Sequence, residues 1–166
     1  MRIVIDLQGA QSESRFRGIG RYTLGLTQAL VRHRGDHEIF IALNGLLFES
    51  IPAIREAFAD LLPTENIRVW FAPGPVRQCD RNNGRRRRIG ESIRESFLSS
   101  LKPDVVLVSS LFEGFADDAV TSIDVFDATT TVFVILYDLI PLLRADEYLL
   151  PNQRLHDLYL SKIEHL

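Results

Sequence analysis

Short apolar segments recur along the 166-residue chain, and they constrain the fold more than any other feature of the sequence. Each is too short for a helix, and most are rich in Val, Ile and Phe, which favours buried β-strands. The predicted strands cover residues 2–7, 37–43, 66–72, 104–109 and 130–137. The last two are almost continuously apolar, and such strands are typical of a parallel sheet covered by helices on both faces.

Longer segments with helical periodicity separate most of these strands. They cover residues 18–34, 50–62, 89–101 and 152–166. Pro63 ends the second of these helices, and Pro103 follows the third. The alternation predicts an α/β fold, namely a Rossmann-like, doubly wound and mostly parallel sheet flanked by helices.

Ligands of such sheets bind beyond the carboxyl ends of the strands, so functional residues should follow strands directly. That rule selects residues 8–21, 73–90, 109–115 and 138–143. In the third segment, Ser110 and Glu113 offer a hydroxyl and a carboxylate, which are good partners for sugar hydroxyls. The alternative is that Glu113 is a solvated loop acid and that the serines cap a turn.

Charge, cysteine and histidine content exclude several classes of function. The 19 basic and 22 acidic side chains leave a formal charge of −3, which argues against a nucleic-acid-binding protein. The N-terminus lacks the pattern of a secretory signal, and no apolar run is long enough to span a membrane. Cys79 is the single cysteine, and the four histidines show no metal-ligand spacing. We therefore expect a soluble protein that is not exported and holds no metal.

Two glycines at the start of the first predicted helix form a candidate anion site. The segment comprises Gly18, Ile19, Gly20 and Arg21. Glycines at a helix N-terminus let backbone N–H groups approach a phosphate, and nearby arginines at positions 15, 17 and 21 favour an anion. The dinucleotide and P-loop glycine motifs are both absent. The alternative is a tight turn that lets the helix pack on the sheet.

Two motifs, each placed after a predicted strand, resemble the bacterial family-4 glycosyltransferases. They are DLQGAQ with SRFRGIGRYT, at residues 6–11 and 14–23, and YDLIPL, at residues 137–142. The resemblance implies the GT-B architecture, in which two Rossmann-like domains enclose a cleft. It also implies retaining transfer of a sugar from a nucleotide-sugar donor, which is a substrate rather than a cofactor, to a saccharide or lipid-linked glycan acceptor in cell-surface polysaccharide synthesis.

The resemblance assigns roles to individual residues. Gly18, Ile19, Gly20 and Arg21 would face the donor diphosphate across the cleft. Tyr137 and Asp138 would lie beside the acceptor and the transferred sugar as catalytic residues, and Tyr137 stands where the family often has histidine. From their places after predicted strands, rather than from the resemblance, we expect Gln8, Ser110 and Glu113 to contact the acceptor. The alternative for Asp138 is a turn residue that satisfies backbone N–H groups ahead of Pro141.

The most concentrated charge of the chain is the arginine run at residues 85–88, with Arg77 and Arg81 nearby. The polar residues around it predict a mobile, solvated loop. Because the resembling family often works at the cytoplasmic face of the membrane, the run is also a candidate for contact with anionic headgroups. It lacks the interleaved aromatic residues of a nucleic-acid site.

We expect residues 1–166 to form the acceptor-side domain of such an enzyme, without its C-terminal nucleotide-sugar domain. The family's pair of glutamates seven residues apart is absent, and the last predicted helix has no capping glycine or proline, which is typical of a fragment. The alternative function is a stand-alone α/β module that binds a nucleotide or phosphate without transfer activity. On the first hypothesis, the isolated chain shows no turnover with nucleotide sugars.

Overall fold

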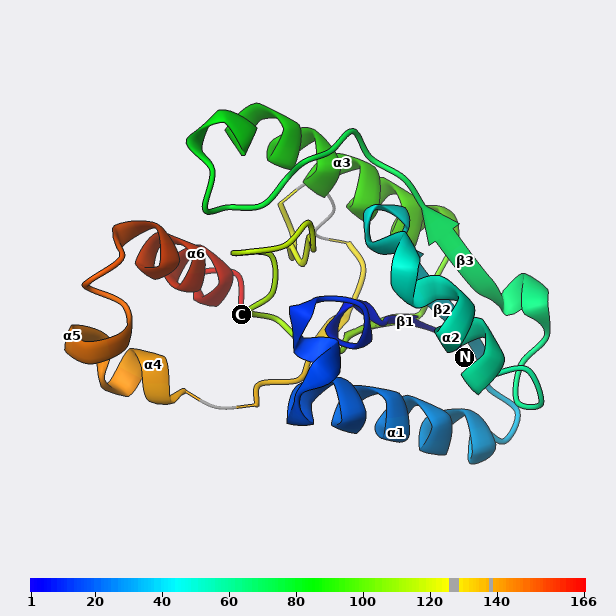
Figure 1. The fold of residues 1–166 in the computed structure, drawn as a ribbon. Helices are drawn as coiled ribbons and strands as arrows, with labels where there is room; N and C mark the ends of the chain where they lie inside the picture. Colours follow the sequence, from blue (N-terminus) through cyan, green and yellow to red (C-terminus); the bar gives the residue numbers. More distant parts are fainter. Residues whose placement is uncertain (126–128, 138) are drawn as a thin grey trace.

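A computed structural model describes residues 1–125, 129–137 and 139–166 of the chain (Figure 1). All five described strands form one parallel sheet in the order β3-β2-β1-β4-β5. The strands are β1 Arg2–Asp6, β2 Glu38–Asn44, β3 Ile67–Trp70, β4 Val105–Val108 and β5 Val132–Val134. The structure therefore confirms the predicted Rossmann-like α/β fold.

Six α-helices are described. They are α1 Gly18–Arg32, α2 Ile51–Ala57, α3 Gly84–Ser100, α4 Ile140–Leu143, α5 Ala145–Tyr148 and α6 Gln153–Ile163. Five 3₁₀ turns complete the described elements: η1 Gln8–Ala10, η2 Glu13–Phe16, η3 Gly45–Ser50, η4 Thr64–Asn66 and η5 Arg81–Asn83. The short helices α4 and α5 and the 3₁₀ turns were not predicted.

Alternating side chains of the buried strands supply two separate cores. Ile5, Ile41 and Leu43 point to one face, where they pack with Val31 of α1 and Ile54 of α2. The neighbouring positions point to the opposite face and pack under α3, namely Val4, Phe40, Ala42, Val106 and Val108 with Leu98. This double burial is the physical reason for the apolar runs in the sequence.

The order of strands reverses its direction at β1, which fixes where polar residues gather. The chain runs from β1 outward to β3, and α3 then carries it across the sheet to β4 on the other side of β1 (Figure 1). Segments that follow β1, β2 and β4 therefore meet at the carboxyl edge of the sheet, where α/β folds bind ligands.

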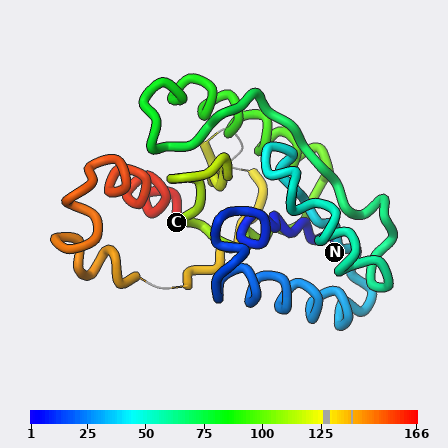
Figure 2. Tube along the Cα trace, viewed as in Figure 1, coloured from blue at the N-terminus to red at the C-terminus, as the bar shows by residue number. Residues whose placement is uncertain are grey.

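The last part of the chain, from α4 to α6, lies beyond this same edge (Figure 2). Its contacts are with loops: the Phe112 and Tyr159 rings stack with centroids 4.2 Å apart, and Arg154 donates to the carbonyl of Cys79. The helix α6 thus covers the connections that leave β3 and β4.

Candidate functional site

The predicted glycine segment begins helix α1, but its two glycines lie in different environments. Gly18 is exposed, and a Cβ at this position would meet nothing within 4 Å. Gly20 is buried, and a Cβ there would lie 2.6 Å from the carbonyl oxygen of Arg15. Gly20 is therefore required for close packing of α1 on the η2 turn, rather than on the sheet as the alternative prediction had it.

A cavity of about 460 Å³ opens beside this contact, and we call it the glycine-loop cavity. It lies between the segment after β1, the start of α1 and residues 49–54 after β2. Its lining residues are Ala10, Arg15, Phe16, Gly20, Arg21, Leu24, Glu49, Ser50, Ala53 and Ile54. Among the residues predicted to face the donor, Gly20 and Arg21 line this cavity.

Charged and aromatic side chains shape its rim. The Arg15 guanidinium pairs with Glu49 at 3.3 Å, donates to the carbonyl of Gln11 and lies over the Phe16 ring. Phe16 is 73% exposed, so its ring offers an apolar face to solvent. Arg21 is also exposed. The cavity thus combines an apolar floor with cations at the rim, a pattern typical of small-molecule sites.

Ser110 and Glu113, both predicted to bind acceptor, are hydrogen-bonded to each other. The Ser110 hydroxyl donates to Glu113 at 2.8 Å, and the Ser14 hydroxyl donates to the other carboxylate oxygen at 3.1 Å. Burial raises the pKa of the Glu113 carboxyl, and its hydrogen bonds to serines oppose that shift. Glu113 is therefore a buried acid that ties the segment after β4 to the segment after β1, rather than a solvated loop residue.

Gln8 lies beneath the edge rather than on it. Its side chain is buried and donates to the Asp6 carboxylate and the carbonyl of Val120, while its oxygen accepts from Asn44 and from the Val120 N–H. All of its polar atoms are thus used inside the protein. Its contact with an acceptor stays a prediction, and its observed role is to join the segments that follow three strands.

Tyr137 follows β5 and is anchored to its neighbours through its hydroxyl. The hydroxyl donates to the carbonyl of Ser109 at 3.0 Å and lies 2.6 Å from Oγ1 of Thr23 on α1. Burial raises the Tyr137 pKa above its usual value near 10, so the phenol stays neutral near neutral pH. Tyr137 can hydrogen-bond a sugar but cannot replace the acid–base chemistry of a histidine. Asp138 lies outside the described residues.

A buried ion pair that was not predicted from the sequence supports this edge from below. Asp6 at the end of β1 pairs with Arg94 of α3, whose Nε lies 2.7 Å from Oδ2, and both residues are only 1% exposed. Arg94 also donates to the carbonyl of Ser122. The acid that ends the first apolar strand was the available signal, because a buried carboxylate needs a partner.

The predicted mobile loop at residues 85–88 is wrong, because this arginine run forms the first turns of α3. Arg87 is buried, pairs with Glu91 at 3.3 Å and donates to the carbonyls of Val76 and Gly114. Arginine has a high helix propensity, and these contacts add order to the run. Arg85 and Arg88 are exposed, so a contact of these two side chains with anionic headgroups stays a prediction.

The described residues contain no helix long and apolar enough to cross a bilayer. They also contain no group of three or more His, Cys, Asp or Glu side chains that could hold a metal ion.

Comparisons with known proteins confirm the resemblance to a glycosyltransferase. The chain is 34% identical over 165 residues, 98% of its length, to a serotype-specific mannosyltransferase WbdA of Escherichia coli. A second WbdA of Escherichia coli is 31% identical over 140 residues, or 83% of the chain. The chain spans about a fifth of the length of these relatives, at 19% and 17%. No family model and no solved structure matches. By sequence, this Rossmann-like chain is therefore similar to one segment of the WbdA mannosyltransferases.

Proposed function

We propose that the chain is the acceptor-side domain of a retaining family-4 glycosyltransferase of GT-B architecture, acting in cell-surface polysaccharide synthesis. The observation that carries the proposal is the similarity to a WbdA mannosyltransferase of Escherichia coli, which covers 98% of the chain. Mannose from a nucleotide-sugar donor is the sugar that this similarity favours. A saccharide or lipid-linked glycan would be the acceptor.

The geometry of the carboxyl edge supports a division of roles. Gly18, Ile19 and Arg21 surround the start of α1, where helix N–H groups and a cation favour the donor diphosphate. The glycine-loop cavity has the size of a small-molecule site, and the exposed ring of Phe16 borders it.

The acceptor would lie against the segments that follow β4 and β5. Ser110 and Glu113 supply a hydroxyl and a carboxyl that can exchange hydrogen bonds with sugar hydroxyls. Tyr137 contributes a neutral hydroxyl, and Asp138 follows it directly in the sequence. On this proposal a second domain holds the nucleotide, and the isolated 166-residue chain binds acceptor but does not transfer sugar.

An NMR-monitored titration of the chain with mannose-containing oligosaccharides tests the proposal. We expect saturable shifts of residues around α1 and the Ser110–Glu113 segment. The variant Arg21→Gln should leave saccharide binding intact and should weaken the binding of a nucleoside diphosphate. The variant Arg32→Gln is the matched control, because Arg32 is exposed on the same helix but does not line the cavity.

Binding of nucleotide diphosphate without any saccharide binding would contradict the acceptor-side role. It would instead support the stand-alone nucleotide- or phosphate-binding module.

The proposal also places the protein in the cytoplasm, at the inner face of the membrane. The double variant Arg85→Gln, Arg88→Gln removes the two exposed charges of the run and leaves the buried Arg87 contacts intact. Reduced binding to anionic liposomes supports this placement, and unchanged binding contradicts it.

A further inference from the structure

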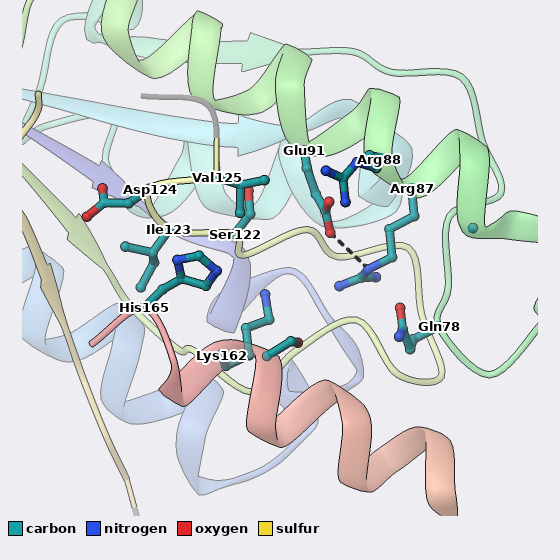
Figure 3. A pocket seen from close by; sticks show the side chains of 12 residues that line it. Gln78, Arg87, Arg88, Glu91, Ser122, Ile123, Asp124, Val125, Lys162 and His165 are labelled. Carbon is teal, nitrogen blue, oxygen red and sulfur yellow. Dashed lines mark ion pairs between the residues drawn. The ribbon is translucent and has the colours of Figure 1, made fainter. Parts of the chain in front are cut away.

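A second cavity, separate from the glycine-loop cavity, lies between α3 and α6 and has a volume of about 520 Å³ (Figure 3). Its walls are the first turns of α3, residues 122–125 after β4 and the end of α6. Arg87 and Arg88 enter it from α3, and Lys162 enters it from α6. We call it the α3–α6 cavity. Three basic side chains from two helices that are distant in the sequence thus line one cavity.

Arg87 has unused hydrogen-bonding capacity in this cavity. Its Nε pairs with Glu91, and its Nη1 donates to the carbonyls of Val76 and Gly114. Its Nη2 is buried and has no hydrogen-bond partner among the residues that the structure describes. Leaving a buried donor of a charged group without a partner costs free energy. We therefore expect an acceptor from outside the described residues at this position.

Lys162 also has hydrogen-bond donors without an acceptor among the described residues. It is 5% exposed, and in the described part of the chain its ammonium donates to one acceptor, Oγ1 of Thr121 at 2.8 Å. An ammonium carries three N–H donors, so two remain for a ligand. In Figure 3 the Arg87 guanidinium and the Lys162 ammonium point toward the same space.

Among the described residues, the basic side chains around this space outnumber the carboxylates that pair with them. Arg87 pairs with Glu91 and Arg94 pairs with Asp6, and no described carboxylate forms an ion pair with Lys162. Arg88 adds another cation at the rim, where Asp124 is the one further carboxylate among the lining residues. The first turn of α3 contains no acidic residue, and the helix dipole adds positive potential there.

We infer that the α3–α6 cavity binds the phosphate group of a soluble phosphorylated ligand. A phosphate monoester presents several acceptor oxygens and a charge that Arg87 and Lys162 can both contact. The volume falls in the range of small-molecule sites, so a phosphorylated monosaccharide fits. The inference does not rest on the proposed function, because phosphate binding is measured without any transfer reaction.

The environment of Lys162 makes this binding dependent on pH. Burial and the neighbouring Arg87 and Arg94 lower the Lys162 pKa well below its usual range, and Glu91 and Asp6 oppose that effect only in part. A bound phosphate would raise the pKa again, because it favours the charged ammonium. Phosphate binding should therefore be linked to proton uptake by Lys162.

Calorimetric titration of the 166-residue chain with inorganic phosphate and with a hexose 1-phosphate tests the inference. We expect saturable binding with a Kd of about 1 mM or tighter, accompanied by proton uptake measured in buffers of different ionisation enthalpy. Lys162→Met should weaken binding by about tenfold or more and reduce the proton uptake. Arg88→Gln should weaken binding by a smaller factor.

Arg85→Gln is the matched control. Arg85 belongs to the same arginine run and carries the same charge, but it is exposed and does not line the cavity. Thermal unfolding separates ligand binding from a structural role. Lys162→Met should unfold at the same or a higher temperature than the wild type, because it removes a buried charge while preserving side-chain length.

Equal weakening by Arg85→Gln and Lys162→Met would overturn the inference, because it would indicate general electrostatic attraction. So would phosphate binding that is unchanged in Lys162→Met. Binding confined to vesicles containing phosphatidic acid, with none to soluble phosphates, would assign the charge to a membrane contact and overturn the inference as well.

Discussion

The contact between α1 and the η2 turn makes Gly20→Ala a sharp test of the structure. A Cβ at position 20 would lie 2.6 Å from the carbonyl oxygen of Arg15 and 2.7 Å from its carbonyl carbon, whereas ordinary contacts of a Cβ lie at 3.4–4 Å. These neighbours are backbone atoms, so a rotamer change cannot relieve the clash. The turn and the helix must separate instead.

The magnitude follows from two opposing effects. Overpacking of this kind costs about 1–3 kcal/mol, and replacing glycine by alanine within a helix contributes about 0.5–1 kcal/mol in the other direction. Gly25→Ala is the matched control, because Gly25 lies in the same helix and a Cβ there would meet nothing within 4 Å. The helix effect is shared, so Gly20→Ala should be less stable than Gly25→Ala by about 1–3 kcal/mol, the overpacking cost.

Urea unfolding followed by circular dichroism measures both free energies of unfolding. The free energy of unfolding of Gly25→Ala should exceed that of the wild type, and that of Gly20→Ala should be lower than that of Gly25→Ala. Equal stability of the two variants would refute the close packing of η2 on α1. It would also remove the argument that Gly20 shapes the glycine-loop cavity, because Arg15 of that turn lines the same cavity.

Three further predictions follow from buried charges and from the proposed division of roles. Asp6→Asn should destabilise the protein by about 3–5 kcal/mol in urea unfolding, because it leaves Arg94 buried without its carboxylate, and adding Arg94→Met should restore part of that loss. The raised Glu113 pKa means that this acid contributes stability at low pH that is lost as pH rises from the ordinary glutamate pKa through the raised one. Glu113→Gln should remove that pH dependence, and an unchanged pH profile of stability would contradict the buried acid. The 166-residue chain should show no release of nucleotide from nucleotide sugars, and measured transfer would refute the proposed second domain.

Much of the fold was predictable because burial on both faces leaves a direct signature in the sequence. The apolar runs identified all five strands, although β5 is shorter than predicted, at Val132–Val134. Parallel pairing followed from the same runs. Short elements such as η2 and α4 escaped prediction, because a few residues carry too little periodicity to distinguish a turn from a loop.

The candidate site was predictable in its position but not in its contacts. The sequence indicated the carboxyl edge and the residues Ser110 and Glu113, which the fold joins by a hydrogen bond. It could not show that the side chain of Gln8 makes all its hydrogen bonds within the protein, or that Arg87 is a buried residue of a helix. Both facts depend on residues far away along the chain, such as Val120 and Gly114.

By itself, the sequence determined the parallel α/β class and the order of the five described strands and the longer helices, since apolar periodicity is a local property that reports burial directly. The tertiary structure decided which polar groups are partnered. The Asp6–Arg94 pair joins residues 88 positions apart, and the Lys162–Thr121 hydrogen bond spans 41 positions. Electrostatic energies depend on distance in space and on exclusion of water, and neither quantity is written in the spacing of residues along the chain.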